Sequence, residues 1–456
     1  VVYHQPIEER VVPVNKATMV VGGGIAGIQA ALQIAEAGHK VYLVERESSI
    51  GGQMAKFDKT FPTMDCAACI LTPKMVAVSQ NPNIELLTYS EVEHVDGYVG
   101  NFKVRVKQKP RYVIEEDCTG CGDCTTACIL RNRFPNEFDE GLSKRSAAYI
   151  PFPQAIPLVA VIDPKECLLL KVGKCSKKCV EACDRKAIDF EQKETVKEIE
   201  VGSIILATGF ELFDPKLAPQ YGYGIYDDVY TGLEFERMTN ASGPTQGKLF
   251  TKKGVEPKSV AVLHCIGSRD KNYKEYCSRV CCMSSVKFSH LVKEKTDAEV
   301  FEFYIDMRTF GKQYEEFYNR VLEEGVNFIR GKGAEVGQVD GRLVVRAEDT
   351  LLGAFREIPV DMVILNTALV PRHDAEKVAQ TFGISRSPDG FFLESHIKLD
   401  PVTTSTDGVH IAGCCQSPKD IPDSVAQGSA AAAQSLSVIA TGKVSVSPIT
   451  AWTNPE

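Results

Sequence analysis

The chain has 456 residues, of which 44% are hydrophobic and 25% are charged, proportions that are ordinary for a globular protein. The length allows roughly two to four domains, and the formal net charge of −8 argues against nucleic acid as a partner. No segment approaches the roughly 18 consecutive apolar residues of a membrane-spanning helix, so we expect no transmembrane segment. The sixteen cysteines, taken as thiolates rather than disulfides, indicate a reducing cytoplasm.

The N-terminal part of the sequence predicts a dinucleotide-binding unit. Residues 17–21 have the pattern of a buried strand, a glycine-rich turn follows over 22–27, and a helix is expected over 28–37. A second strand over 39–44 ends at Glu45, an acid about 20 residues after the turn that is placed to accept hydrogen bonds from a ribose. The alternative is a glycine-rich turn without a ligand. The expected contacts are Gly22, Gly24, Ile25, Ala26, Gly27, Glu45 and Arg46.

Three further segments favour FAD over NAD as the dinucleotide. Residues 48–53 resemble the continuation of this motif in flavoproteins with two dinucleotide-binding domains, and residues 204–209 resemble the strand that passes close to FAD. Residues 406–413 resemble the strand that normally ends in Gly-Asp at the flavin, although Cys414 replaces the Asp. The helix that begins near Asp420 could stabilise negative charge on a reduced flavin. The expected contacts are Gly52, Gln53, Ala207, Thr208, Gly209, Gly413, Asp420 and Ile421.

Eight cysteines in the middle of the chain predict two iron–sulfur clusters. The first four have the spacing C-x2-C-x2-C-x3-C, with which bacterial ferredoxins use three cysteines for one 4Fe-4S cube and the fourth for its neighbour. The prolines that usually follow the fourth cysteines are replaced by Ile129 and Asp184. Zinc, which favours paired C-x2-C knuckles, and disulfides, which suit small secreted proteins, are the alternatives. The predicted ligands are Cys118, Cys121, Cys124, Cys128, Cys167, Cys175, Cys179 and Cys183.

The predicted second nucleotide domain has lost its nucleotide motif. A strand is expected over 259–263, but His264 and Cys265 follow it where paired glycines would be needed for a pyrophosphate. Four cysteines cluster there within 18 residues, and we expect a third 4Fe-4S cluster rather than scattered buried thiols. Its predicted ligands are Cys265, Cys277, Cys281 and Cys282.

Two cysteine pairs leave their roles open. Cys66 and Cys69 are either a redox dithiol, half of a metal cluster site completed by another segment or subunit, or structural residues. Cys414 and Cys415 are expected near the flavin, with plain packing as the alternative.

The predicted fold class is therefore α/β, with two thioredoxin-reductase-like Rossmann domains and an inserted α+β two-cluster ferredoxin domain. The FAD-binding domain is expected over 12–110, 196–255 and 373–456, the ferredoxin insert over 111–195, and the degenerate NAD-type domain over 256–372.

Long segments of the chain resemble the A subunits of heterodisulfide reductases, a family that includes the A subunit of the quinone-interacting membrane-bound oxidoreductase. The matching segments are 22–27, 60–74, 118–128, 136–141, 151–155, 232–237, 265–270, 276–282 and 418–427. The resemblance implies FAD, several 4Fe-4S clusters, a cytoplasmic location and a role in methanogenesis. It also implies assembly with B and C subunits and with a hydrogenase, a formate dehydrogenase or another electron donor. We expect a homodimer within that larger complex.

The chain departs from that family at several points. We expect no N-terminal cluster domain before Val11 and no C-terminal ferredoxin after Thr441, although longer members carry such modules. Asn366 stands in a segment where relatives often have Thr-Gly, and Cys415 stands where they often have a small residue.

The working hypothesis is a flavin-based hub that bifurcates or confurcates electrons. Lys419, at the head of the helix on the flavin side, is the candidate catalytic residue, because a lysine there would stabilise a reduced flavin. The alternative is a non-bifurcating conduit between a quinone module and a soluble reductase. A scaffold whose clusters hold partner proteins together is a third hypothesis. A pyridine-nucleotide disulfide reductase ranks last because Cys265 occupies the place of its NADPH motif.

Overall fold

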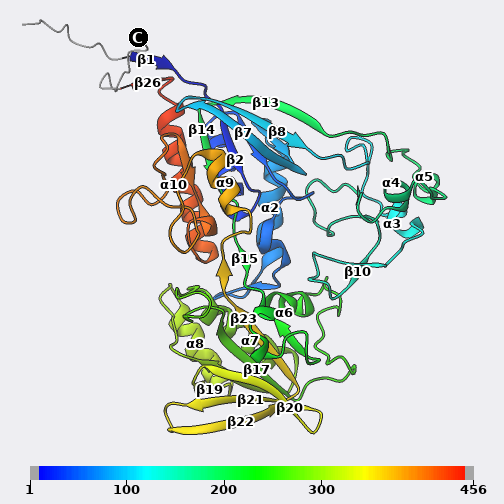
Figure 1. The fold of residues 1–456 in the computed structure, drawn as a ribbon, viewed down its shortest axis with the longest axis vertical. Coiled ribbons are helices and arrows are strands. Elements are labelled where there is room, and N and C mark those ends of the chain that lie inside the picture. The colour runs from blue at the N-terminus through cyan, green and yellow to red at the C-terminus, as the bar shows by residue number, and fades with distance from the viewer. Residues whose placement is uncertain (1–9, 447–456) are drawn as a thin grey trace, which may run out of the picture.

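The structure is a computed structural model that describes residues 10–446, and its first layer is a five-stranded parallel sheet (Figure 1). The strand order is β25-β14-β2-β3-β6. Buried aliphatic residues fill most of these strands because both faces of the sheet are covered, one by helices and the other mainly by an antiparallel meander described below. The strands are β2 Thr18–Val21, β3 Val41–Val44, β6 Ile84–Leu87, β14 Ser203–Leu206 and β25 Val409–Ile411.

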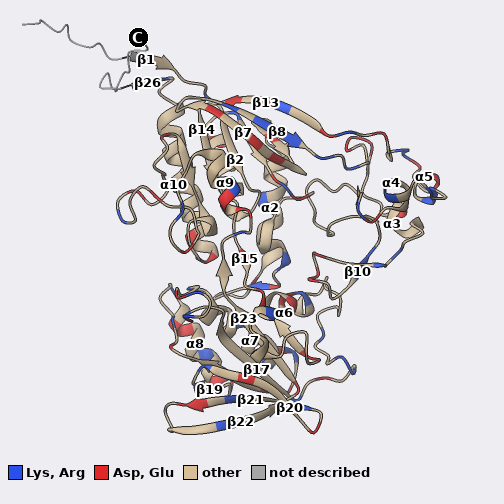
Figure 2. Ribbon diagram, viewed as in Figure 1, with Lys and Arg blue, Asp and Glu red and all other residues tan. Residues whose placement is uncertain are grey.

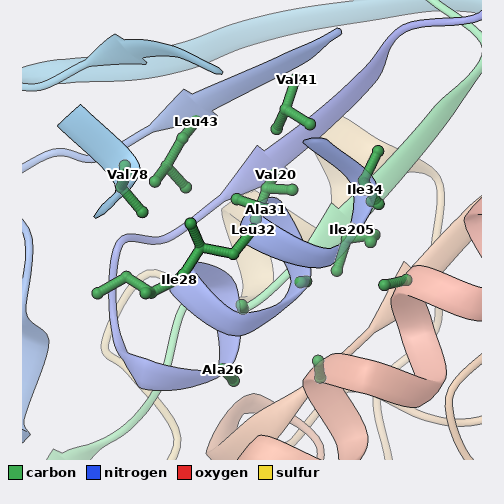
Figure 3. Close-up of a cluster of buried hydrophobic side chains, with 14 of the residues drawn as sticks. Val20, Ala26, Ile28, Ala31, Leu32, Ile34, Val41, Leu43, Val78 and Ile205 are labelled. Atoms are coloured by element: carbon green, nitrogen blue, oxygen red, sulfur yellow. The ribbon is translucent and has the colours of Figure 1, made fainter. Parts of the chain in front are cut away.

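The helices of this domain are α1 Ile25–Glu36, α2 Ala67–Gln80, α9 Ala375–Phe382 and α10 Ile421–Ile439. Figure 3 shows Ile28, Ala31 and Ile34 of α1 among side chains of the central strands. A Cβ atom at Gly428 of α10 would lie 2.5 Å from the carbonyl oxygen of Ala26, so glycine allows α10 to pack directly against α1. Because α1 begins at Ile25 rather than at 28, its first turn contains the last three residues of the glycine-rich segment 22–27.

A three-stranded antiparallel meander flanks this sheet, and the insert interrupts it. The insert leaves after Gln108 and returns at Thr195, and these two residues face each other in the ladder. The meander consists of β7 Ser90–Tyr98, β8 Asn101–Gln108 and β13 Thr195–Val201. The insert contains α3 Asp123–Ala127, α4 Leu168–Val172 and α5 Lys178–Glu181, with β9 Phe134–Pro135, β10 Lys144–Arg145, β11 Ala148–Tyr149 and β12 Val161–Ile162.

A second five-stranded parallel sheet has the order β16-β23-β17-β18-β19. It is made of β16 Val229–Thr231, β17 Ser259–Ile266, β18 Glu299–Tyr304, β19 Asn327–Arg330 and β23 Met362–Thr367. The helices beside it are α6 Gly232–Thr239, α7 Cys281–Lys295 and α8 Tyr314–Glu323, and an antiparallel sheet of β20 Gly333–Val339, β21 Arg342–Asp349 and β22 Ala354–Val360 extends it.

The predicted boundary between residues 255 and 256 is corrected by the strand pairing. β16 bonds to β23 of the second sheet, and Phe213 and Tyr221 pack in the core of that sheet. The second domain therefore begins near residue 213. Its edge strand, β16, precedes β17, the strand that the sequence pattern identified as the first of the domain. Residues 447–456 of the predicted last segment lie outside the described residues.

Short elements complete the chain. They are β1 Arg10–Pro13, β4 Lys59–Thr60, β5 Asp65–Cys66, β15 Glu211–Leu212, β24 Leu369–Val370 and β26 Lys443–Val446, with 3-10 turns η1 Gly52–Lys56, η2 Pro215–Leu217, η3 Pro219–Tyr221 and η4 Gly413–Cys415. Within residues 10–446, no helix is both long enough and apolar enough to cross a membrane.

Candidate functional site

The glycine-rich turn between β2 and α1 has the geometry of a pyrophosphate cradle. Gly22 has a φ of +110°, and a Cβ atom there would lie 2.3 Å from the carbonyl oxygen of Ala207. A Cβ at Gly27 would lie 1.9 Å from the Gly22 oxygen, so both positions require glycine. A Cβ at Gly24, by contrast, would meet nothing within 4 Å. Gly24 is also the N-cap of α1 without a capping side chain, so the free N–H groups of the first turn are available to an anion.

Glu45 and the loop after β3 form the next part of the cradle. The Glu45 carboxylate accepts hydrogen bonds from the N–H groups of Gly23 at 2.6 Å and Glu47 at 2.8 Å. Its burial raises the pKa of this carboxyl group. Gly52 lies over Gly24, since a Cβ at Gly52 would be 3.0 Å from the Gly24 Cα. The Oε1 atom of Gln53 is buried without a hydrogen-bond partner among the described residues, which fits a ligand with a hydrogen-bond donor.

The opposite side of the cradle is built from the ends of β14 and β25. Gly413 has a φ of +77°, and its N–H donates to Oε1 of Gln427 at 3.0 Å. The Asp420 carboxylate caps α10 by accepting from the N–H of Asp423 at 2.9 Å, and it also accepts from the hydroxyl of Tyr314 at 2.5 Å. Asp420 therefore already has protein partners, and its contact with a cofactor stays a prediction. The open backbone positions of the cradle together fit FAD.

The remaining predicted FAD contacts differ in whether they already bond to other protein residues. Arg46 forms an ion pair with Asp374 at 2.9 Å. Ile25 and Ala26 form the first turn of α1, and Ile421 begins α10. Ala207, Thr208 and Gly209 follow β14, and a Cβ at Gly209 would meet nothing within 4 Å. Their contacts with FAD stay predictions.

Lys419 is turned toward its own loop. Its Nζ donates to the carbonyl oxygens of Ser417 at 2.7 Å and Gly413 at 2.9 Å, and to Oε1 of Gln416 at 2.9 Å. The residue is 5% exposed, and this burial lowers the pKa of its ammonium group. These bonds fix the loop that follows β25, so the structure describes a positioning residue; direct contact with a flavin stays a prediction.

The eight cysteines of the insert fall into two groups of four. The first group is Cys118, Cys121, Cys124 and Cys183, and the second group is Cys128, Cys167, Cys175 and Cys179. Burial, followed by the charge of the neighbouring thiolates, raises the pKa of Cys124 and of Cys179 to about 11. Cys128, the fourth cysteine of the first sequence run, thus belongs to the second group, and Cys183, the fourth of the second run, belongs to the first group. Two-cluster ferredoxins distribute their cysteines between the two clusters in the same way.

These groups are wider than a site for one ion. Within residues 10–446, no three His, Cys, Asp or Glu side chains lie close enough together to hold a single metal ion. A cube has a different requirement because each thiolate binds a different iron atom. The four cysteines of the second group line one small cavity, together with Lys178. We find that the donor set and its spacing in the insert fit 4Fe-4S clusters.

Four more thiols gather at the end of β17 and the start of α7. Cys265 has a φ of +58°, and Cys281 and Cys282 are the first residues of α7. Burial is the largest cause that raises the pKa of Cys281, and the thiols of Cys265, Cys277 and Cys282 add to it. The start of α7, where an NAD pyrophosphate would meet the backbone, is thus occupied by sulfur.

A buried histidine and a carboxylate support this third group. The Nε2 atom of His264 lies 2.7 Å from Oε1 of Glu302, whose Oε2 accepts from the hydroxyl of Ser289 at 2.5 Å. Burial alone lowers the pKa of His264, but Glu302 and Cys282 raise it to about 9. Burial likewise raises the pKa of Cys282, yet His264 more than offsets this effect and the pKa is lowered. Neither Glu302 nor Ser289 belongs to a cysteine motif, so no sequence pattern pointed to them.

The structure shows the bonding and burial of the two cysteine pairs whose roles the sequence did not decide. Cys66 and Cys69 form a disulfide at the N-terminus of α2, and the Cys66 sulfur accepts a hydrogen bond from the N–H of Cys69 at 3.2 Å. This is the oxidised form of a dithiol, while ligation of a cluster shared with another segment stays a prediction. Cys414 and Cys415 are buried, and their thiols donate to the carbonyl oxygens of Lys419 and Leu206, both at 3.3 Å.

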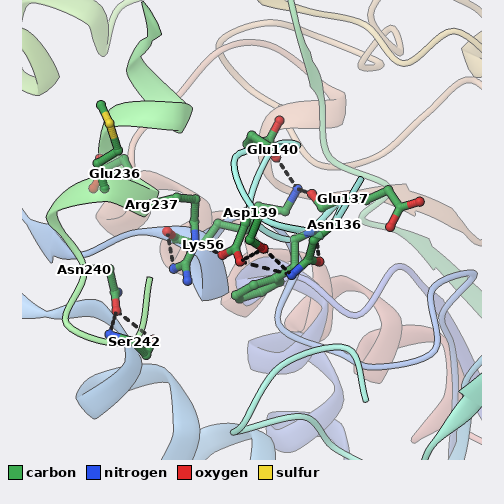
Figure 4. Close-up of polar contacts among 12 residues, drawn as sticks. Lys56, Asn136, Glu137, Asp139, Glu140, Glu236, Arg237, Asn240 and Ser242 are labelled. Carbon is green, nitrogen blue, oxygen red and sulfur yellow. Dashed lines mark hydrogen bonds and ion pairs between the residues drawn. The ribbon is translucent and has the colours of Figure 1, made fainter. Parts of the chain in front are cut away.

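A polar junction joins the insert to both Rossmann domains (Figure 4). Nε of Arg237 in α6 donates to Oδ1 of Asp139 in the insert at 3.0 Å, and Nη1 donates to the carbonyl oxygen of Lys56 at 3.1 Å. Nζ of Lys56 in turn pairs with Glu140 at 2.5 Å. Asp139 and Arg237 lie in segments that carry the family resemblance, but a charge pair across 98 residues leaves no local pattern from which its role could be predicted.

The family model of FAD dependent oxidoreductases matches residues 18–65, which include the glycine-rich turn and Glu45. A relative from Methanothermobacter marburgensis, named as the A subunit of an H(2):CoB-CoM heterodisulfide,ferredoxin reductase, is 52% identical over 457 positions. The alignment covers 99% of this chain and 68% of the relative. This chain belongs to the family of heterodisulfide reductase A subunits. The family resemblance seen in the sequence is thereby confirmed.

Other relatives of this heterodisulfide reductase chain agree. The iron-sulfur A subunit of the CoB--CoM heterodisulfide reductase of Methanocaldococcus jannaschii is 49% identical, over 98% of this chain and 68% of the relative. Among solved structures, the thioredoxin reductase of Lactococcus lactis is similar, with a TM-score of 0.52 over 93% of this chain and 99% of that one. At 15% sequence identity, this similarity is evidence for a shared fold and for nothing further. The predicted Rossmann flavoprotein fold is confirmed, and the chain is an oxidoreductase subunit that binds FAD.

Proposed function

We propose that this chain is the FAD- and iron–sulfur-containing electron hub of a heterodisulfide-reductase-like complex, in which an electron pair is divided between two one-electron routes. The observation that carries the proposal is the replacement of a nucleotide-binding motif by cysteines at the second sheet. Four cysteines stand at the end of β17 and the start of α7, where a nicotinamide dinucleotide would bind. Electrons therefore reach and leave the chain through sulfur-bound iron and protein partners, not through a bound hydride donor.

The residues described above define where each group would be held. FAD would lie along Gly22, Gly24 and Glu45, with Gly413 and the start of α10 opposite. The two groups in the insert and the group formed by Cys265, Cys277, Cys281 and Cys282 would hold three 4Fe-4S clusters. A flavin, when bound, supplies both two-electron and one-electron chemistry. Because burial raises the pKa of Cys124 and of Cys179 to about 11, these two thiols would lose their protons when iron binds.

The insert contacts the FAD cradle directly, which supports electron exchange between them. The N–H of Ile156 donates to Oγ of Ser49 at 2.9 Å, and the N–H of Ile50 donates to the carbonyl oxygen of Ile156 at 3.1 Å. Ser49 and Ile50 immediately precede Gly51 and Gly52. The module that would carry two clusters therefore rests on the loop that shapes the FAD site.

The names of the relatives indicate the partners that we propose. One relative, from Methanococcus maripaludis, is named for H(2)/formate, and one from Methanosarcina acetivorans for ferredoxin/F(420)H(2). By analogy we propose that this chain works in the cytoplasm as a homodimer, with B and C subunits and a hydrogenase or formate dehydrogenase as donor. Its reaction would belong to methanogenesis.

A redox titration of the purified native complex tests the division of the electron pair. We expect the two one-electron potentials of the flavin in inverted order, so that the half-reduced flavin is a stronger reductant than the fully reduced flavin. Potentials in the ordinary order would refute bifurcation and favour the simple conduit. Iron analysis of the chain gives a second criterion: about 12 iron atoms per chain indicate three clusters, and about eight indicate only the two in the insert.

A further inference from the structure

A buried carboxylate lies inside the parallel sheet of the second domain. Figure 2 shows that many charged residues of this domain lie on its helices and on the outer sheet of β20, β21 and β22. Of the three acidic and basic residues within the five parallel strands, Glu299 and Arg330 are exposed, whereas Glu302 is 0% exposed. Burying a lone carboxylate costs free energy, so Glu302 requires partners that donate hydrogen bonds to it.

Two buried side chains are those partners. Nε2 of His264 lies 2.7 Å from Oε1 of Glu302, and the hydroxyl of Ser289 donates to Oε2 at 2.5 Å. His264 is 1% exposed and Ser289 is 0% exposed. Because both oxygen atoms of the carboxylate act as acceptors, Nε2 of His264 carries a proton and donates it to Glu302.

The other ring nitrogen of His264 has no such partner. Nδ1 is buried, and no nitrogen or oxygen atom of residues 10–446 forms a hydrogen bond with it. Cys282 lies beside the ring: burial raises the pKa of this thiol, but a hydrogen bond from His264 and the charge of its ring lower the pKa below the ordinary value. A sulfur atom that binds iron has no proton to give, so Nδ1 can pair with it only as a donor.

The third thiol group is more buried than the groups in the insert. Cys265, Cys281 and Cys282 are each 4% exposed, whereas Cys121 in the insert is exposed. A buried site disfavours the negative charge that reduction adds to a cluster, and a hydrogen-bond donor has its strongest effect there. Within residues 10–446, no Lys, Arg or His side chain forms a hydrogen bond with a cysteine of the insert. A charged donor beside a ligand sulfur therefore distinguishes the third group.

We propose that His264 is a positioning residue that donates a hydrogen bond to the Cys282 sulfur and thereby raises the reduction potential of the third 4Fe-4S cluster. The proposal rests on the proposed function, because it requires iron at the third thiol group. Hydrogen bonds to the sulfur ligands of a cluster favour its reduced form. Glu302 and Ser289 hold the imidazole in place and keep it protonated, so the buried cluster accepts an electron more readily than its burial alone would allow.

The test is a redox titration of the purified complex followed by electron paramagnetic resonance (EPR), using the signal that Cys265→Ser removes. The variant His264→Leu/Glu302→Gln removes the donor without leaving a buried carboxylate unpaired. We expect the ratio of reduced to oxidised third cluster at a fixed potential to fall at least about 10-fold, which corresponds to about 59 mV for a one-electron couple. His264→Gln, whose amide can still donate, should show a smaller fall.

A second histidine–glutamate pair of the same domain provides the matched control. Nδ1 of His290, also on α7, lies 2.8 Å from both carboxylate oxygens of Glu324. His290→Leu/Glu324→Gln makes the same chemical change away from the thiols and should leave the potential of the third cluster unchanged. An equal fall in this control would overturn the proposal, because the effect would then not depend on the contact with Cys282.

Iron content separates the failure of this proposal from the failure of the proposed function. Full iron with an unchanged potential in His264→Leu/Glu302→Gln refutes the role of His264 and leaves the proposed function intact. About eight irons in the wild-type chain would show that the third cluster is absent, and both the cluster assignment and this proposal would fall. Where the double variant loses iron, the wild-type complex decides: with 15N-labelled histidine, pulsed EPR of the reduced third cluster should detect a coupled histidine nitrogen, and its absence would overturn the proposal.

Discussion

Replacing Arg237 should release the insert from the second domain. Arg237 is 1% exposed and Asp139 is 8% exposed, so the substitution Arg237→Met leaves an acidic group buried without its counter-ion. Two unit charges 3.0 Å apart attract each other by about 5 kcal/mol at an effective dielectric constant of about 20. Measured losses on removing one partner of a buried pair are about 3–5 kcal/mol. The guanidinium also lies 4.6 Å from the ring of Phe138, a cation–π contact that methionine cannot make.

Hydrogen exchange detects this loss locally, which avoids the assumption that a multidomain protein unfolds in one step. The N–H groups of Gly141 and Leu142 bond to the carbonyl oxygens of Asn136 and Asp139 within the loop that Arg237 holds. A loss of about 3 kcal/mol corresponds to roughly 100-fold faster exchange, because each 1.4 kcal/mol is a factor of about ten. We therefore expect at least that acceleration at Gly141 and Leu142, while amides of β2 keep their protection.

Two controls accompany this experiment. Arg320→Met removes an exposed arginine of α8 that forms no ion pair within the described structure, and it should leave the loop unchanged. The double variant Arg237→Met/Asp139→Asn should lose less protection than the two single losses added together, because the charges act on each other. Unchanged exchange at Gly141 and Leu142 in Arg237→Met would refute the claim that this ion pair holds the insert in place.

Four further predictions concern the cofactor site, the third cluster, a buried histidine and the disulfide. Gly24→Val should leave the fold intact, since a Cβ there meets nothing within 4 Å, but should abolish bound FAD in the absorption spectrum; normal FAD content would contradict the cradle. Cys265→Ser should lower the iron content by about four atoms per chain, and an unchanged iron count would remove this site. Burial lowers the pKa of His410 from 6.5 to about 4, so the folded protein resists its protonation. Stability should fall by up to about 3 kcal/mol as the pH drops from 6.5 toward 4, and thermal melting of His410→Leu should show a smaller fall than wild type; an equal fall would rule out His410 as the cause. Cys69 is exposed and bonded to Cys66, so alkylation of Cys69 followed by mass spectrometry should require a dithiol reductant; labelling without it would contradict the disulfide.

The sequence predicted the elements whose signals are local. The turn at Gly22–Gly27, the acid at Glu45 and the cysteine spacing each depend on a few neighbouring residues, and the structure places them as their patterns require. The prediction was least accurate where the signal is distant. β16 of the second sheet is three residues long and gains its place only by pairing with β23, more than 130 residues later in the chain. Nothing in the three residues Val229–Thr231 predicts that β23 is their partner.

The role of Lys419 shows the same limit inside the site. Its place before α10 is readable from the sequence, and a lysine near a flavin is a reasonable chemical expectation. The direction of its side chain depends on the turn at Gly413, whose φ of +77° brings a carbonyl oxygen within 2.9 Å of Nζ. A four-carbon side chain can reach either way, so only tertiary structure decides between a flavin contact and a loop contact.

The point at which the insert enters the chain explains how a flavin domain accommodates a cluster-binding module. Gln108 and Thr195 are paired residues of neighbouring strands, so the two ends of the insert leave the meander about 5 Å apart. Closing β8 onto β13 therefore requires no rearrangement of the meander, whatever the length of chain between them. The insert would still be free to swing on this narrow neck. Contacts at three separate places prevent this: Ile156 with Ser49, Glu140 with Lys56, and Asp139 with Arg237. Because the rate of electron transfer falls steeply with distance, these contacts would hold the clusters that we propose for the insert at a fixed separation from the FAD cradle.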